Sequence, residues 1–361
     1  MSAPVIFLLI VLGGCVVPRS ADAAAPTNAD DAAAMKSIAN STGAAKSLGW
    51  GVHSPDPCDG TWYGVRCDDT GRVTAINASR GGLSGVINAV DLGWLASLSE
   101  LDLSFNDFSH QELPLLHRPL GVLRSLDLRS GAFQSIPGGF FTAFPALEDI
   151  AIDGNDMLGL PLPQDVLTCS RLRSFSANNV NMHSTFPNFF GNASLFPDLE
   201  SLSLRGNSVY GYVGNDFGNN SKIKFLDVSA QEHDDDDYNN GLSGIVEFFT
   251  GMENIEEVHL DHNDFYGKLP DATHLVNLRR FNAANNVELC GIPKFPAGTE
   301  IDFVDGNPKE LVDSYTVAEA EYDPAQLDHR RKVYNIQLLI SDCFGEITKK
   351  IVSIEHLRVY I

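Results

Sequence analysis

The sequence predicts an α/β repeat protein: a right-handed solenoid of short parallel strands, covered at its N-terminal end by a cysteine-bearing cap. Three observations lead to this fold class. A leucine-based pattern recurs about every 25 residues, each copy is too short to form a sheet alone, and two cysteines stand just before the first copy. The chain has 361 residues and is 43% hydrophobic, which is enough to bury a continuous core.

Each copy follows the pattern Leu-x-x-Leu-x-Leu-x-x-Asn with conservative replacements, as in "LSELDLSFN" at 98–106. Nine copies begin at Val73, Leu98, Leu123, Leu147, Leu172, Leu199, Ile223, Ile255 and Leu278. Successive starts are 25, 25, 24, 25, 27, 24, 32 and 23 residues apart, and the longest step contains "HDDDDYNN" at 233–240. This period is that of the leucine-rich repeat, in which stacked coils bury one another's apolar residues.

The ninth position of each copy turns the chain away from the strand, where an asparagine amide can bond the free backbone groups of the turn. We expect these asparagines to be buried: Asn106, Asn155, Asn207, Asn263 and Asn286. Other residues interrupt this series, so their turns need another solution: Gly131, Val180 and Gln231. Gly and Pro then mark the outer return of each coil, as in "YGKLP" at 266–270.

The sequence divides into four segments. Residues 1–23 are expected to be a signal peptide, because an apolar run of 13 residues from 5 to 17 precedes Ala21-x-Ala23. A short membrane anchor is the alternative, although such a run is short for a bilayer span. We expect a cap at 27–70, about nine repeats at 71–308, and an atypical tail at 309–361 that packs poorly on the solenoid. Disorder and a gene-prediction artefact both remain open for that tail.

Secretion would place the cysteines in an oxidising compartment. Five cysteines remain after Cys15 leaves with the signal: Cys58, Cys67, Cys169, Cys290 and Cys343. Cys169 is predicted to be a buried thiol, and the partners of Cys290 and Cys343 stay open. For Cys58 and Cys67, a zinc site is disfavoured because no second cysteine pair or histidine cluster accompanies them. Four sequons are candidate glycosylation sites: Asn40, Asn77, Asn192 and Asn219.

Charge and motifs argue against several functions. With 25 basic and 47 acidic residues, the net charge is −22, which disfavours nucleic acids and anionic membranes. The triplet Asp216-Phe217-Gly218 lacks the other kinase motifs, so Phe217 is interpreted as a packing residue. The "HDDDDY" run at 233–238 lacks the spacing of a calcium loop, and His259 and His262 have no third ligand. We therefore expect no metal, no cofactor and no catalytic site.

The remaining candidate is the concave surface of the sheet. Residues at the seventh repeat position are expected to point to that surface, and four on neighbouring coils form one polar row: Arg129, Asp153, Asn178 and Arg205. Because charged groups on a preformed sheet give specific contacts, this row is the predicted ligand-binding site. Solubility alone would also favour polar residues at these positions.

The sequence resembles the ectodomain of the plant TMK group of transmembrane receptor-like kinases over about residues 32–308. The resemblance rests on stretches such as "SLGWGVHSPDPC" at 47–58 and "FPNFFGNASLFPDLESLSLRGN" at 186–207, and the Gly-x-[I/L]-Pro return is that of the plant extracellular subclass. It implies a disulfide between Cys58 and Cys67, with Trp62 covering the first coil. It also implies a cell-surface solenoid in growth-related, including auxin-related, signalling. The family adds further repeats, a membrane span and a kinase domain, none of which is recognisable in this sequence.

The sequence therefore predicts a non-catalytic module that binds an extracellular peptide, protein, small ligand or co-receptor. We expect it in the apoplast or cell wall, or at the plasma membrane if it belongs to a truncated receptor. Kinase activity would require a longer transcript. The alternative is a soluble cell-wall inhibitor of pathogen glycanases, similar to polygalacturonase inhibitors. Such inhibitors usually pair cysteines at both ends, and Cys290 has no second cysteine close in sequence, which favours the receptor-like module.

Overall fold

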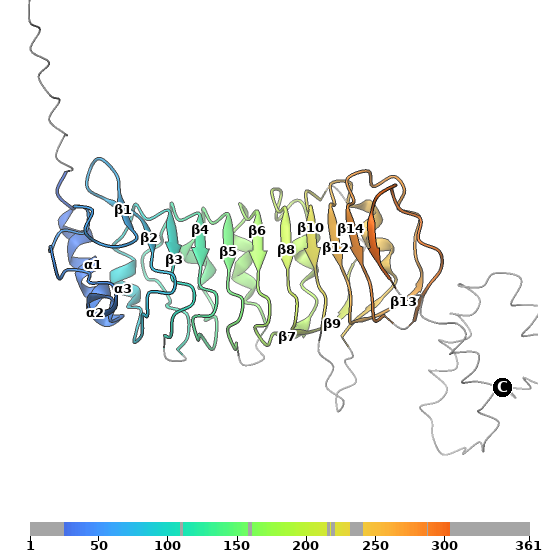
Figure 1. Ribbon diagram of the computed structural model, residues 1–361, viewed down its shortest axis with the longest axis horizontal. Helices are drawn as coiled ribbons and strands as arrows, with labels where there is room; N and C mark the ends of the chain where they lie inside the picture. Colours follow the sequence, from blue (N-terminus) through green and yellow to red (C-terminus); the bar gives the residue numbers. More distant parts are fainter. Residues whose placement is uncertain are drawn as a thin grey trace, which may run out of the picture.

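The chain forms a curved solenoid with a helical cap at its N-terminal end (Figure 1). The computed structural model describes residues 25–108, 111–157, 161–214, 217, 221–231, 241–286 and 288–303. The expected signal peptide at 1–23, the insertion at 233–240 and the tail at 309–361 lie outside these residues. No helix among those that are described is long and apolar enough to cross a bilayer.

One long sheet runs the length of the solenoid. Its strands, in spatial order, are β1 Val65–Cys67, β2 Val73–Asn77, β3 Glu100–Asp102, β4 Ser125–Asp127, β5 Asp149–Ala151, β6 Ser174–Ser176, β8 Ser201–Ser203, β10 Phe225–Asp227, β12 Glu257–His259, β14 Arg280–Asn282 and β16 Glu300–Asp302. All neighbours from β2 onward are parallel, and β1 is antiparallel to β2. The nine predicted registers are confirmed, whereas β1 and β16 were not predicted.

The strand register aligns the fourth repeat position of every coil, so that apolar side chains stack through the interior. Leu226, for example, pairs with Leu202 on one side and Val258 on the other. All three are fully buried. Burial of one such side chain contributes about 1.5–3 kcal/mol, so the repetition of this layer supplies much of the stability.

The asparagines at the ninth position are buried, as predicted, and each joins two coils. Asn207 donates from Nδ2 to the carbonyls of Ala177 and Leu204, both at 2.8 Å. Its Oδ1 accepts from the amides of Val180 and Met182 at 3.1 and 3.0 Å. The side chain therefore satisfies backbone groups that neither coil could satisfy by itself.

Gln231 corrects one expectation, because it continues the asparagine series. Its Nε2 donates to Leu204 O at 3.0 Å and its Oε1 accepts from Val209 N at 3.0 Å, the same kinds of contact that Asn207 makes. The turns at Gly131 and Val180 have no side-chain amide at the ninth position and satisfy backbone groups of the preceding coil in another way, as expected. Their backbone carbonyls accept from the amides of the preceding coil, at 3.1 and 2.9 Å.

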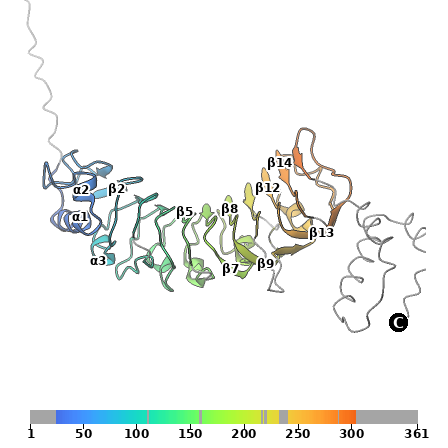
Figure 2. The ribbon, with the colours of Figure 1, turned by 60° about the horizontal axis from the view of Figure 1, so that its bottom comes forward.

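A second sheet lies on the return side of the later coils and was not predicted. Its parallel strands are β7 His183–Thr185, β9 Ser208–Tyr212, β11 Leu242–Gly244, β13 Asp264–Lys268 and β15 Glu288–Cys290. The 3₁₀ helices of the outer side are η1 Phe141–Ala143, η2 Gln164–Thr168, η3 Asn188–Gly191 and η5 Val246–Gly251. Figure 2 shows the solenoid bending, with the long sheet along the inner side of the bend. The long sheet therefore provides the concave surface.

The cap consists of α1 Ala29–Ser41, α2 Ala44–Ser47 and the loop that leads into β1, with α3 Ala89–Leu92 beside them. The implied disulfide between Cys58 and Cys67 is confirmed. Trp62 is buried and stacks on Trp50 with 5.5 Å between ring centroids. These rings cover the apolar end that the first coil would otherwise expose.

An ion pair fastens α1 to the first coil. The Asp31 carboxylate is completely buried and lies 2.9 Å from Arg72 Nη2. Its other oxygen accepts from the Val73 amide at 2.8 Å, at the start of β2. Burial raises the pKa of Asp31 more than the Val73 hydrogen bond and the Arg72 charge lower it. The cap is therefore joined to the repeats by a specific polar contact as well as by the tryptophans.

Cys169 is a free, buried thiol, as predicted. It lies just after η2, where Phe141 O and Phe144 O are 3.6 and 3.5 Å from its sulfur. Burial raises the pKa of this thiol to about 12. Since the thiolate is the reactive form, this cysteine is a packing residue.

Candidate recognition surface

The four predicted residues lie on four neighbouring coils, each two residues after a strand of the long sheet. Arg129 follows β4, Asp153 follows β5, Asn178 follows β6 and Arg205 follows β8. Three side chains are half-buried and Arg205 is exposed, so none belongs to the core. Parallel strands lie about 4.8 Å apart, so this row covers roughly 14 Å along the concave surface.

Arg129 is engaged within its own coil rather than with the next member of the row. Its Nε donates to both oxygens of Asp127 at 3.0 Å, and Nη2 donates to Oδ2 at 2.6 Å. These hydrogen bonds raise the pKa of the guanidinium. The side chain stays 43% exposed, so the fixed guanidinium is still accessible to a partner.

The other three members form a continuous chain of hydrogen bonds. Asp153 Oδ1 accepts from Ser176 Oγ and from the Asn178 amide, both at 2.6 Å. Asn178 Oδ1 in turn accepts from Ser203 Oγ at 2.8 Å and from the Arg205 amide at 2.7 Å. Each side chain thus fixes the backbone of the following coil, and the row is rigid before any partner binds.

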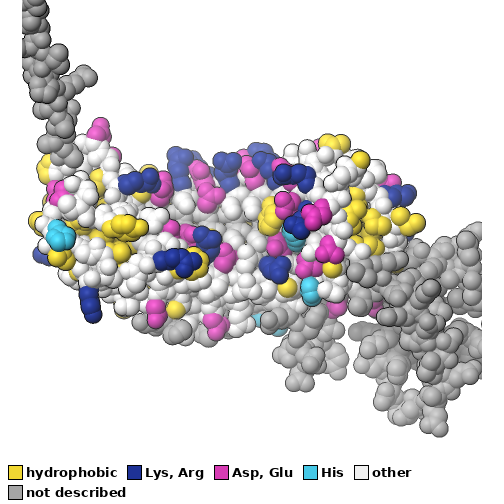
Figure 3. Space-filling model, viewed as in Figure 1, with side chains coloured by type: hydrophobic (Ala, Val, Ile, Leu, Met, Phe, Trp, Pro, Cys, Tyr) yellow, Lys and Arg dark blue, Asp and Glu magenta, His cyan; other side chains and the backbone are white. Residues whose placement is uncertain are grey.

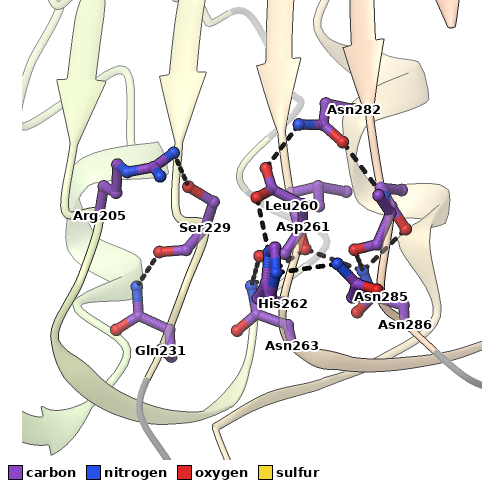
Figure 4. A network of polar contacts seen from close by, with 12 residues as sticks. Arg205, Ser229, Gln231, Leu260, Asp261, His262, Asn263, Asn282, Asn285 and Asn286 are labelled. Atoms are coloured by element: carbon purple, nitrogen blue, oxygen red, sulfur yellow. Dashed lines mark hydrogen bonds and ion pairs between the residues drawn. The ribbon is translucent and has the colours of Figure 1, made fainter. Parts of the chain in front are cut away.

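The network continues beyond the predicted row, as Figure 4 shows. Arg205 Nη1 donates to Ser229 Oγ at 3.2 Å, and Ser229 Oγ donates to Asp227 Oδ1 at 2.6 Å. One coil beyond Ser229, a second group of bonds is centred on buried Asp261, which accepts from Asn282 Nδ2 at 2.8 Å and contacts His262 Nδ1 at 2.9 Å. The predicted row did not include Asp227, Ser229, Asp261 and Asn282, although these polar residues stand at the fifth and seventh repeat positions.

Charges also line one rim of the sheet, at the second repeat position, where blue and magenta side chains alternate along the upper edge in Figure 3. The residues are Arg124, Glu148, Arg173, Glu200, Lys224, Glu256 and Arg279. Glu200, for example, lies 2.7 Å from both Arg173 and Lys224. Exposed pairs of this kind contribute about 0–1 kcal/mol each. Because the signs alternate, the rim presents little net charge to a partner.

The structure also shows where the residues considered for kinase or metal chemistry lie. Phe217 is buried, with its ring centroid 5.5 Å from that of Phe186, in agreement with a packing role. Asp216, Gly218 and the run at 233–238 lie outside the described residues. His262 is exposed, as expected, but the His259 side chain is only 15% exposed and packs beside Phe225, 5.6 Å between ring centroids. The described residues contain no group of three acidic, histidine or cysteine side chains able to hold a metal.

Three of the sequon asparagines are exposed, namely Asn40, Asn77 and Asn192, and Asn219 lies outside the described residues. Asn77 is the last residue of β2, so a glycan on it would extend from the first coil of the concave surface. Glycosylation at all four remains a prediction.

Comparisons with known proteins agree with this architecture. Residues 28–68 match the family described as Leucine rich repeat N-terminal domain. Over 237 residues the chain is 30% identical to receptor-like kinase TMK2 of Arabidopsis thaliana, which covers 66% of this chain and 26% of TMK2. Receptor-like protein kinase BRI1-like 3 of the same plant is 31% identical over 160 residues, or 43% of this chain and 13% of that protein.

A solved structure shares the fold. It contains the Arabidopsis receptor kinase HAESA in complex with the peptide hormone IDA and the co-receptor SERK1. The matched chain has a TM-score of 0.51 and 21% identity, covering 76% of this chain and 50% of that one. The alignments with curated relatives fall on the solenoid, and this chain spans about a quarter of the length of TMK2.

Proposed function

The chain is a leucine-rich repeat solenoid of the plant receptor-kinase ectodomain type, and we propose that it binds an extracellular peptide or protein partner without catalysis. The binding surface is the concave face of the middle coils, centred on Arg129, Asp153, Asn178 and Arg205. The module acts in signalling at the cell surface or in the apoplast. The HAESA complex with a peptide hormone and a co-receptor supports this class of partner for a solenoid of this fold.

One observation carries the proposal: the hydrogen-bonded row from Asp153 to Ser229. A surface whose side chains are already fixed loses little conformational entropy when a partner binds, so more of the contact energy appears as affinity. Isolated polar residues that served only solubility would not need bonds to the backbone of the neighbouring coil. The row therefore has the rigidity expected of a recognition surface.

The open hydrogen-bonding groups of the row indicate what the partner presents. Arg205 forms no ion pair with any described residue, and among those residues its guanidinium hydrogen-bonds only to Ser229 Oγ. The bonds to Asp153 described above use one carboxylate oxygen and leave the other for a partner. A peptide with a carboxylate near Arg205 and a cationic or N–H group near Asp153 would complement this arrangement.

Cys290 is disulfide-bonded, but no second cysteine lies close to it in the sequence, so the local cysteine pair expected near the C-terminal end of an inhibitor is not present there. An inhibitor remains the second candidate, since it would also use a concave leucine-rich surface. The two functions differ in the partner captured: a glycanase whose activity falls on binding, or a peptide or receptor protein without such activity.

Changing Arg129 and Arg205 together to alanine tests the proposed surface. We expect the double variant to keep its circular dichroism spectrum and melting temperature, because neither side chain lies in the core. Capture of the native partner from apoplastic extract should fall at least about tenfold, as expected when charge-assisted contacts are lost. Arg124→Ala with Arg173→Ala, on the rim, is the matched control and should capture normally. Unchanged capture by the Arg129/Arg205 variant would place the site elsewhere.

A further inference from the structure

The eighth repeat position has a left-handed backbone in every coil, and one coil places a bulky apolar residue there. Eight of the nine coils carry small, polar or charged residues at this position, but the second coil has Phe105 with φ of +56°. A large side chain in this region is strained, and such strain concentrates at functional sites. The Phe105 side chain also remains 38% exposed on the concave side instead of entering the core.

Two arginines lie around this ring, one from each neighbouring coil. The Arg80 guanidinium carbon lies 3.8 Å from the Phe105 ring centroid, and that of Arg129 lies 6.0 Å from it. Backbone bonds fix all three positions, because the Arg80 amide donates to Ser104 O at 3.0 Å and the Phe105 amide donates to Arg129 O at 2.7 Å. The three residues form a unit that we call the arginine–phenylalanine clamp.

The clamp retains unused donors. Arg129 is bonded to Asp127, but Arg80 is exposed and forms no ion pair or hydrogen bond through its side chain with any described residue. A guanidinium resting on an aromatic ring is held by the cation–π interaction while its N–H edge stays open. Arg80 is therefore a positioned cation without a carboxylate, in a chain whose net charge is −22.

We propose that the clamp binds a carboxylate side chain of an acidic peptide segment, a binding site at the N-terminal end of the concave surface. The Arg80 guanidinium would hold the carboxylate by paired N–H bonds, and the edge of Phe105 would contact the aliphatic stem of a glutamate. This inference rests on the proposed function, because the same peptide would continue along the row to Arg205.

The spacing suits an extended peptide. Arg80 belongs to the first coil and Arg205 to the sixth, so five strand intervals of about 4.8 Å separate them by roughly 24 Å. About seven extended residues, at about 3.3 Å each, cover this length. A peptide with an acidic residue at one end would thus contact the clamp while its remaining residues contact Asp153 and Asn178.

Tetraglutamate with a fluorescent label is a direct probe of the clamp. Anisotropy titrations at about 0.15 M salt, where long-range repulsion is screened, should show binding to the wild-type chain. Arg80→Gln should weaken it about tenfold, as expected for one charge-assisted contact. Phe105→Asn should weaken it similarly but keep the melting temperature, because asparagine tolerates the left-handed backbone. The matched control is Arg118→Gln. Arg118 also stacks on an aromatic ring, with its guanidinium carbon 3.6 Å from the Trp94 ring centroid, but it does not belong to the row.

Three outcomes would overturn the clamp: no tetraglutamate binding by the wild type, equal binding by Arg80→Gln, or equal loss in Arg118→Gln. If the protein bound labelled tetragalacturonate but not tetraglutamate, the ligand would be an acidic wall glycan rather than a peptide, and the proposal would also be overturned. Titrations with enzymatically deglycosylated protein remove any screening by a glycan at Asn77. Partner capture that depends on Arg205 but not on Arg80 would contradict the clamp while leaving the proposed function intact.

Discussion

Asn207→Ala is expected to lower the free energy of unfolding by about 3–5 kcal/mol, because several buried backbone groups would lose their hydrogen-bond partners. The Asn207 amide serves the carbonyls of Ala177 and Leu204 and the amides of Val180 and Met182. The residue is only 1% exposed, so water cannot easily replace these bonds. Urea unfolding followed by circular dichroism measures the effect.

Asn207→Gln is the matched control for this prediction. Gln231 already satisfies the equivalent groups one coil later, so a longer amide at the same repeat position should retain most of the bonds. We expect the glutamine variant to lose less than half as much stability as the alanine variant. Equal losses would mean that packing volume, rather than the amide contacts, determines the effect.

Asp31→Ala is expected to destabilise the cap by about 2–4 kcal/mol, because it removes one partner of a buried ion pair. The substitution leaves the Val73 amide without its acceptor and Arg72, whose side chain is 23% exposed, without its counter-ion. This loss is somewhat below the about 3–5 kcal/mol typical of breaking a fully buried ion pair, because Arg72 is partly solvated. Hydrogen exchange should show early opening of residues 29–47, whereas unchanged protection there would contradict the role assigned to Asp31.

Asp31→Asn separates the hydrogen bond from the charge. The asparagine oxygen can still accept from Val73, but the group no longer titrates. Because burial raises the pKa of Asp31 in the folded chain above its unfolded value, the folded state binds the proton more readily. The wild type should therefore lose stability relative to Asp31→Asn as pH rises from the ordinary aspartate pKa through the raised folded value. A difference that is flat with pH would mean that Arg72 fully offsets the burial.

The repeat registers could be predicted because the apolar period is a direct consequence of stacking. The fourth repeat position is buried for the same reason in successive coils, as at Leu202, Leu226 and Val258. The spacing of these residues in the sequence therefore predicts that they contact one another. The last strand of the long sheet could not be found in this way. β16 contributes one exposed isoleucine, Ile301, and lacks the leucines of the pattern, so only pairing with β14 reveals it.

The second sheet was also hidden, for a different physical reason. Its strands are three to five residues long and contain glycines such as Gly211 and Gly244 with positive φ, which sequence reasoning interprets as turns. They become strands only because stacking brings consecutive returns side by side. Gln231 was misinterpreted because its side chain is one methylene longer than asparagine, and the structure accommodates this difference.

The candidate row was predictable as a set of positions but not as a network. Repeat spacing places Asp153, Asn178 and Arg205 on neighbouring coils, yet their mutual bonds depend on rotamers that spacing does not specify. The pairing of Arg129 with Asp127 likewise depends on its rotamer, because Asp102 and Asp153 also lie near enough to act on the guanidinium charge. Phe105 was overlooked because a phenylalanine beside the turn is usually interpreted as a core residue. Its left-handed backbone, which directs the ring away from the core, is visible only in the structure.

Site-specific photo-cross-linking tests the central claim most directly. A benzophenone amino acid at position 178, in the row, is compared with one at Val276, which is 78% exposed and lies away from the row. In apoplastic extract, we expect one dominant cross-linked partner at 178 and no such product at 276. Unlabelled wild-type protein should compete for this partner, whereas the Arg129/Arg205 double variant should not. Equal cross-linking at both positions, or competition by the double variant as effective as by the wild type, would contradict recognition on the concave face.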